Sequence, residues 1–228
     1  MLFALIRGQL DIYSALIEVA AILIIIFLVL PFHEWAHAYT ALKLGDTSVK
    51  YRGRLTLNPL AHIDPFGALA LLLFGFGWAK PVPIDPRNFK NPKAGMALTA
   101  LMGPVANIVA ALAGGLIYMA LVALFPQFLF ANTVGKYIAL FFQFYISVNC
   151  TLAVFNLIPI PPLDGSKILF LFLPDSAVAW FYKYQMFISI GLLALLWTGI
   201  LSVPLSALSS LLMNGVMFLA RLPFMAFM

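Results

Sequence analysis

Residues 14–44 read SALIEVAAILIIIFLVLPFHEWAHAYTALKL, an apolar run that ends at the pair Gly45-Asp46. At about 1.5 Å per residue, a helix of this length crosses a hydrocarbon layer about 30 Å thick with length to spare. Glycine just after the last helical residue is a common helix stop. The run therefore predicts a transmembrane helix close to the start of the sequence.

The rest of the sequence has the same membrane character. Of 228 residues, 64% are hydrophobic and 9% are charged, whereas a soluble domain carries about 25% charged residues. Eight of the thirteen basic residues lie in two short stretches, 43–54 and 80–93, which indicates membrane topology and no nucleic-acid partner. The single cysteine, Cys150, excludes an intrachain disulfide and a cysteine-rich metal site.

The uncharged runs predict an all-α membrane protein, a polytopic bundle of about five to six transmembrane helices. Residues 94–135, between Lys93 and Lys136, suit one long span and an external turn, and residues 137–163 suit a return span. Residues 184–220, broken at Pro204, can make two more, of which the last is the weakest. We expect no removable signal peptide in residues 1–10, because no small-residue cleavage pattern follows the apolar run.

A shorter uncharged segment, residues 65–79, lies between the two basic stretches. Fifteen residues are too few to cross comfortably, and basic residues favour the cytoplasmic side at both ends of the segment. We therefore expect a re-entrant segment between the first and second spans, covered by protein or by a watery cavity. The same charge pattern predicts a multi-pass protein of the cell membrane with its N-terminus outside.

The pentapeptide His33-Glu34-Trp35-Ala36-His37 lies within the first predicted span. Residues four apart share one face of a helix, so the two imidazoles can bind one metal ion while Glu34 projects beside them. Zinc accepts such ligands and can activate water, for which Glu34 is the natural general base. The alternative is a chance pentapeptide at a helix end, but three ionisable residues inside a membrane are costly without a partner.

Two imidazoles leave a zinc site one protein ligand short, and Asp164 is the best candidate for the third. It ends an uncharged run, and nearby Lys167 places it toward the cytoplasmic side, as predicted for the histidines. The preceding prolines cannot continue a helix, so we expect the span to open after about Leu157 into an extended stretch. The alternative is a solvated Asp164 or one that pairs with Lys167.

These motifs resemble the site-2 protease family of intramembrane zinc metalloproteases, in its small bacterial and archaeal form without PDZ or CBS domains. The resemblance rests on HEWAH (33–37) and NLIPIPPLDG (156–165), supported by NPLAHIDPFG (58–67), GWAKPVP (77–83) and GPVAN (103–107). It implies a catalytic core within about residues 14–170, followed by C-terminal helices at about 176–222, in one metalloprotease domain of residues 1–228.

The resemblance also implies roles for particular residues. One Zn²⁺ per chain would be held by His33, His37 and Asp164, with Glu34 as the catalytic base, near the cytoplasmic side. The substrates would be single-span membrane proteins in the lipid bilayer, cut within their transmembrane segments. The substrate site would be shaped by Asn107, Asn156, Pro159 and Pro161.

Several alternatives stay open at the level of sequence. His62 could approach the metal and the substrate, or be a solvated loop histidine. Asn107 and Asn156 could donate hydrogen bonds to a substrate carbonyl or satisfy helix backbone. A metal-transport protein, or an inert binder of membrane proteins, could use the same residues, although transport predicts polar residues across the whole membrane. The sequence does not indicate an oligomeric state.

Overall fold

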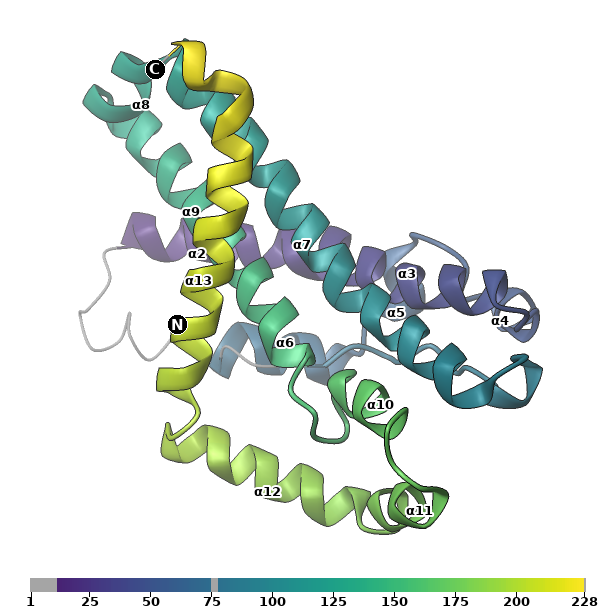
Figure 1. Ribbon diagram of the computed structural model, residues 1–228. Coiled ribbons are helices and arrows are strands. Elements are labelled where there is room, and N and C mark those ends of the chain that lie inside the picture. Colours follow the sequence, from purple (N-terminus) through teal and green to yellow (C-terminus); the bar gives the residue numbers. More distant parts are fainter. Residues whose placement is uncertain (1–11, 75–77, 228) are drawn as a thin grey trace.

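The computed structural model describes residues 12–74 and 78–227 (Figure 1). Its first three elements form one continuous helix: α2 (Ile12–Ile24), the π-helical segment η1 (Ile25–Val29) and α3 (Leu30–Lys43). The N–H of Leu30 bonds to the carbonyl of Ile25, five residues back. This wide turn lies just before Pro31, whose ring would crowd the preceding carbonyl of a regular helix and which has no N–H to donate. The helix ends at the expected place, where Gly45 adopts a φ of 118°.

The next segment carries short helices: α4 (Ser48–Tyr51), α5 (Pro59–His62), α6 (Pro65–Phe74) and η2 (Pro86–Asn88). An isolated antiparallel bridge joins Ile63 to Ala79, and the N–H of Lys80 donates to the carbonyl of His62 at 2.8 Å. The two ends of the segment around α6 therefore lie side by side, which is the geometry that a re-entrant segment requires. This bridge is the strand-like pairing found among the described residues.

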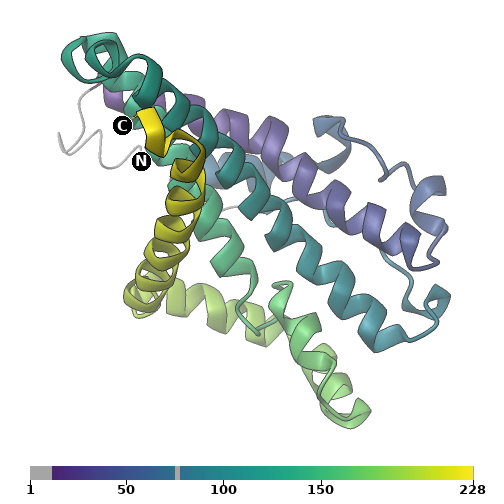
Figure 2. The same ribbon diagram turned by 45° about the horizontal axis from the view of Figure 1, so that its top comes forward.

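The centre of the bundle is built by α7 (Pro92–Leu124), which packs against α3 and α9 (Thr133–Asn156). A short helix, α8 (Pro126–Ala131), makes the turn between α7 and α9. Figure 2 shows α3 and α7 side by side. Small residues allow this close packing, because helix backbones approach each other where side chains are short; the buried small residues of α7 include Ala100, Gly103, Ala106, Ala110, Ala111 and Gly114.

The C-terminal part comprises α10 (Gly165–Phe170), α11 (Asp175–Lys183), α12 (Gln185–Thr198), α13 (Ser202–Arg221) and η3 (Leu222–Phe227). The predicted break at Pro204 is wrong. The chain turns at Gly199, with a φ of 74°, and Pro204 lies in the first turn of α13, where a helix does not need its N–H. Helix α13 returns to pack on α7 and α9, while α11 and α12 lie at the periphery (Figure 1).

The all-α membrane bundle is confirmed, with four to five candidate spans among the described residues where about five to six were predicted. Within the described ranges, four helices are long and apolar enough to cross a membrane, or up to five if α11 and α12, which are bent by 69°, form one span. The turn at Gly199 explains the difference, since it leaves α12 with 14 residues where a span needs about 20.

Candidate metal centre

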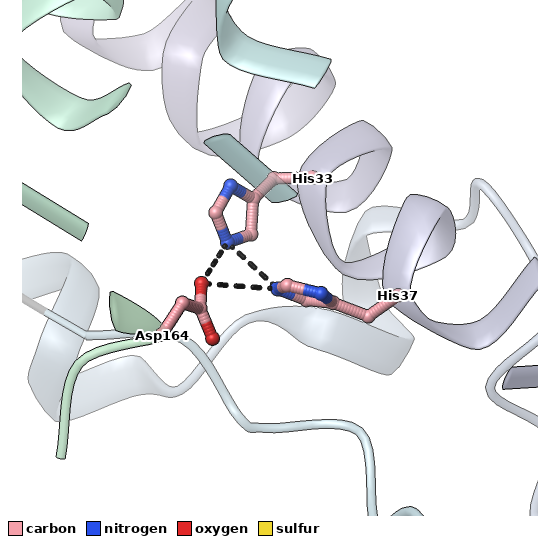
Figure 3. A group of neighbouring side chains, drawn as sticks. All are labelled: His33, His37 and Asp164. Atoms are coloured by element: carbon pink, nitrogen blue, oxygen red, sulfur yellow. Dashed lines mark hydrogen bonds and ion pairs between the residues drawn. The ribbon is translucent and has the colours of Figure 1, made fainter. Parts of the chain in front are cut away.

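His33, His37 and Asp164 meet in one cluster, although Asp164 is far from the histidines in the sequence (Figure 3). The histidines lie one turn apart on α3, and Asp164 directly precedes α10. The Nε2 atoms of the two rings are 3.1 Å apart, and Oδ2 of Asp164 lies 3.4 Å from Nε2 of His33 and 3.2 Å from Nε2 of His37. Both histidines are buried and Asp164 is nearly so.

This triangle of donor atoms fits a small tetrahedral cation. For ligand bonds of about 2.0–2.1 Å, tetrahedral geometry places the ligand atoms about 3.3–3.4 Å apart. The three distances, 3.1–3.4 Å, agree with this spacing. Two imidazoles and one carboxylate are a donor set that zinc accepts in catalytic sites, with the fourth position open to water or substrate.

The opposite side of each imidazole is held by α7. Nδ1 of His37 lies 2.8 Å from the carbonyl oxygen of Thr99, and Nδ1 of His33 lies 2.6 Å from Oδ1 of Asn107. A carbonyl oxygen can only accept, so Nδ1 of His37 carries the proton and Nε2 is left free to bind a metal. Such outer hydrogen bonds orient metal-binding histidines and fix their tautomer.

Two glycines allow the elements to come this close. A Cβ at Gly103 on α7 would collide with the rings of both His37 and His33. A Cβ at Gly165 would collide with the carbonyl oxygens of Leu157 and Ile158, so the turn that follows α9 packs directly against the start of α10. The absence of side chains at these two positions brings α7 to the histidines and Asp164 into the cluster.

Glu34 is buried beside the cluster. Its Oε2 accepts a hydrogen bond from the N–H of Val82 at 3.2 Å, whereas Oε1 accepts none from the part of the chain that the structure describes. Val82 belongs to the non-helical segment between the bridge and η2, and it packs against α3. One carboxylate oxygen of Glu34 is therefore anchored and the other is available.

Asp164 also lies near Lys167, as one alternative from the sequence predicted. The Nζ of Lys167 is 3.4 Å from Oδ1, the oxygen that does not face the histidines. The carboxylate thus faces the histidines with one oxygen and the lysine with the other.

The structure places the residues predicted to shape the substrate site in different surroundings. Asn107 is buried, with its Oδ1 at His33 and its Nδ2 toward Asn149 at 3.4 Å, so protein groups occupy both ends of the amide. Asn156 donates from Nδ2 to the carbonyl of Leu152 on its own helix, at 3.0 Å. Pro159 is exposed and Pro161 is buried.

The proline stretch itself is not extended, contrary to the prediction. Helix α9 ends at Asn156, close to where the prolines predicted an opening. Beyond it, the N–H of Ile158 bonds to the carbonyl of Phe155, that of Ile160 to Ile158, and that of Leu163 to Ile160. Tight turns arise because these local carbonyls supply the partners that buried N–H groups need.

His62 is fully buried, so the solvated-loop interpretation is wrong. Its Nε2 lies 2.7 Å from the carbonyl oxygen of Thr56, while Nδ1 has no hydrogen-bond partner among the described residues. It is not a member of the metal cluster. Its backbone carbonyl pairs with Lys80, so its position is tied to the base of the segment around α6.

Sequence reasoning missed three groups that contact the site or its supports. Two are backbone groups, the carbonyl of Thr99 and the N–H of Val82, and no pattern of side chains indicates them. The third is Asn149, a buried amide on α9 that meets Asn107. A polar residue within an apolar span needs a partner, and this signal could have singled out Asn149.

Fold and site together define a membrane-bound metallohydrolase with the site among its spanning helices. Residues 114–197 match the family described as "Peptidase family M50". The chain is 43% identical over 148 residues to "Putative zinc metalloprotease YwhC" of Bacillus subtilis (strain 168), which covers 64% of this chain and 67% of YwhC. The chain therefore belongs to peptidase family M50, the site-2 protease family of zinc metalloproteases, as the motifs predicted.

A more distant relative agrees with this assignment. The chain is 33% identical over 138 residues to "Putative zinc metalloprotease Rip2" of Mycolicibacterium smegmatis (strain ATCC 700084 / mc(2)155). This match covers 58% of the chain and 49% of Rip2, so the chain spans about half the length of that relative. No solved structure matches the chain.

Proposed function

We propose that this protein is an intramembrane endopeptidase that cleaves single-span membrane proteins within their transmembrane segments, using one Zn²⁺ per chain. The observation that carries the proposal is the triangle of His33, His37 and Asp164, which places three suitable donor atoms at tetrahedral spacing. Helix α7 begins at Pro92, so its contacts with the histidines, Thr99 and Asn107, lie about 10 Å and about 22 Å along it. The site is thus well inside a helix that is long enough to span a membrane.

Glu34 is the proposed general base. Zinc bound by the three residues would polarise a peptide carbonyl and make a water molecule acidic enough to lose its proton near neutral pH. The free Oε1 of Glu34 takes that proton and passes it to the leaving nitrogen. The hydrogen bond from the N–H of Val82 to Oε2 holds the carboxylate in one orientation during the proton transfer.

A transmembrane substrate must unwind before cleavage, because a helix hides its carbonyls in its own hydrogen bonds. The segment that carries Val82 passes Glu34 without forming a helix. An unwound substrate can pair with such a segment by strand addition, and this gives its backbone groups partners at membrane depth. We therefore place the substrate beside residues 78–85.

The active site is proposed to open toward the cytoplasm. Val49, from one basic stretch, packs in one buried cluster with Val82 and Phe89 from the other. Both basic stretches therefore lie at one end of the bundle, where α3 ends and α7 begins. Since basic residues favour the cytoplasmic side, this end is the cytoplasmic one.

The experiment that tests the proposal compares the wild-type protein with Glu34→Gln, purified in detergent. Loss of the general base should lower the cleavage rate of a model transmembrane substrate about 10²- to 10⁴-fold. Zinc content, measured by elemental analysis, should stay at one ion per chain because the ligands are intact. Cleavage at the wild-type rate by zinc-loaded Glu34→Gln contradicts the mechanism, and a zinc-loaded wild type that cleaves nothing favours an inert binder.

A further inference from the structure

A chain of hydrogen bonds leads from His33, away from the metal centre, to helix α9. It begins between Nδ1 of His33 and Oδ1 of Asn107 at 2.6 Å. It continues from Nδ2 of Asn107 to Oδ1 of Asn149 at 3.4 Å, and from Nδ2 of Asn149 to the carbonyl of Tyr145 at 2.9 Å. Asn107 and Asn149 are 2% and 0% exposed, so water does not compete for these amides. The chain connects α3, α7 and α9.

The direction of every bond in this chain follows from its last member. The backbone carbonyl of Tyr145 can only accept, so Asn149 turns its NH₂ group toward it and its Oδ1 toward Asn107. Asn107 must then donate to Asn149 and present its own Oδ1 to His33. Because Oδ1 only accepts, Nδ1 of His33 carries the proton and Nε2, which faces His37 and Asp164, carries the lone pair.

His37 also carries its proton on Nδ1, because this nitrogen donates directly to the backbone carbonyl of Thr99. The partner of His33 is instead an amide, which can turn over and offer its NH₂ group. That orientation would favour a proton on Nε2 of His33 and so oppose metal binding. Asn149 is the residue that opposes this reversal.

We propose that Asn149 is a positioning residue for the metal: it fixes the orientation of Asn107 and, through Asn107, the metal-binding tautomer of His33. The inference rests on the proposed function, because it takes His33 as a zinc ligand. Asn149 does not touch the metal or the substrate. Its effect is on zinc affinity and on the proton of one imidazole.

The first test measures the zinc dissociation constant of purified protein by competition with a chelator. Asn149→Leu removes the amide at similar volume and should weaken zinc binding about tenfold, the lower end of the effect known for outer-shell partners. Gln143→Leu is the matched control, because Gln143 is a side-chain amide on the same helix that donates to the hydroxyl of Tyr118 on α7 but meets no histidine. Its zinc dissociation constant should equal that of the wild type.

A double-mutant cycle separates positioning from packing. An aspartate at position 107 has only acceptor oxygens, so Asn107→Asp holds the Nδ1 proton of His33 however Asn149 is oriented. In this background, Asn149→Leu should cause no further loss of zinc affinity. If Asn149 served only to pack α9, its replacement by leucine would lower the zinc affinity by the same factor in both backgrounds.

A second readout needs neither zinc nor activity. The chain has three histidines, so ¹⁵N-histidine NMR of metal-free protein resolves six ring nitrogens. His33 should be protonated at Nδ1 in the wild type and present both tautomers in Asn149→Leu, while His37 is unchanged. Asn149→Ala carries the same expectation if Asn149→Leu does not fold.

The outcomes distinguish this inference from the proposed function. Equal zinc affinity in the wild type and Asn149→Leu, or an equal loss in both backgrounds of the cycle, overturns the role of Asn149. A wild-type protein that binds no zinc overturns the proposed metal site itself.

Discussion

At the scale of single residues, the metal centre depends on Gly103 as much as on its ligands. The rings of His33 and His37 occupy the space where a side chain at position 103 would lie. Any Cβ there must push α7 away from α3 or rotate the imidazoles. The hydrogen bonds to Thr99 and Asn107 would lengthen in either case.

Gly103→Ala should therefore weaken zinc binding by about 10- to 100-fold, as loss of outer-shell support does. Equilibrium competition with a chelator measures the effect. Gly215→Ala on α13 is the matched control, because a Cβ there meets nothing within 4 Å. Wild-type zinc affinity in Gly103→Ala would show that α7 does not confine the histidines.

At the scale of elements, Asp46 joins the end of α3 to the segment before α7. This fully buried carboxylate accepts hydrogen bonds from the N–H of Ser48 at 3.0 Å, the N–H of Asp85 at 2.8 Å and the side chain of Asn88 at 2.7 Å. Asp46→Ala leaves these donors without their acceptor. We expect a loss of about 3 kcal/mol in the free energy of unfolding, measured by denaturation in detergent.

Asp175→Ala is the control for Asp46→Ala. Asp175 also forms an ion pair, with Lys93 at 2.7 Å, but its side chain is 90% exposed. Exposed pairs contribute about 0–1 kcal/mol, so this variant should change stability little. Equal losses in the two variants would contradict the role of Asp46 as a buried connection.

The same carboxylate makes stability depend on pH. Burial alone would raise the pKa of Asp46, but the hydrogen bonds from Ser48, Asp85 and Asn88 outweigh burial and lower it. A lowered folded-state pKa stabilises the fold above the unfolded value of about 3.9, and this contribution is lost as the pH falls below it. Between pH 6 and pH 3, the unfolding midpoint should fall further for the wild type than for Asp46→Asn.

The elements also show which features of the backbone the sequence patterns did not predict. The apolar run predicted the first helix and its end at Gly45. It did not indicate the π-helical turn before Pro31. The sequence also predicted a break at Pro204, although a proline in the first turn of a helix is harmless and Gly199 makes the turn. Hydrophobic composition indicates which segments are buried and how long they are. Local backbone geometry depends instead on which hydrogen bonds each residue can make.

At the scale of the whole molecule, the proposed orientation predicts which surfaces face each side of the membrane. Arg52 lies beside the basic end of the bundle and Gln127 lies on α8, beyond the other end of α7; both are exposed. The native Cys150 is buried and should not react. A single cysteine introduced at either position can therefore be labelled without a background signal from Cys150.

A membrane-impermeant maleimide applied to intact cells should label Gln127→Cys and leave Arg52→Cys unlabelled until the cells are lysed. The physical reason is the cytoplasmic preference of basic residues. The reverse pattern would invert the proposed topology, and labelling of both in intact cells would place both ends outside. Unsubstituted protein provides the control for Cys150.

Local sequence patterns predicted the membrane-spanning helices and the histidine pair of HEWAH, because hydrophobic length and four-residue spacing act within one helix. They also pointed to Asp164, since a zinc site needs a third ligand. The meeting of Asp164 with His33 and His37, the anchoring of Glu34 by Val82, and the hydrogen-bond chain through Asn149 depend on tertiary packing. These contacts join groups 42 to 131 positions apart, and no local pattern records which donor will face which acceptor once α3, α7, α9 and the start of α10 pack together.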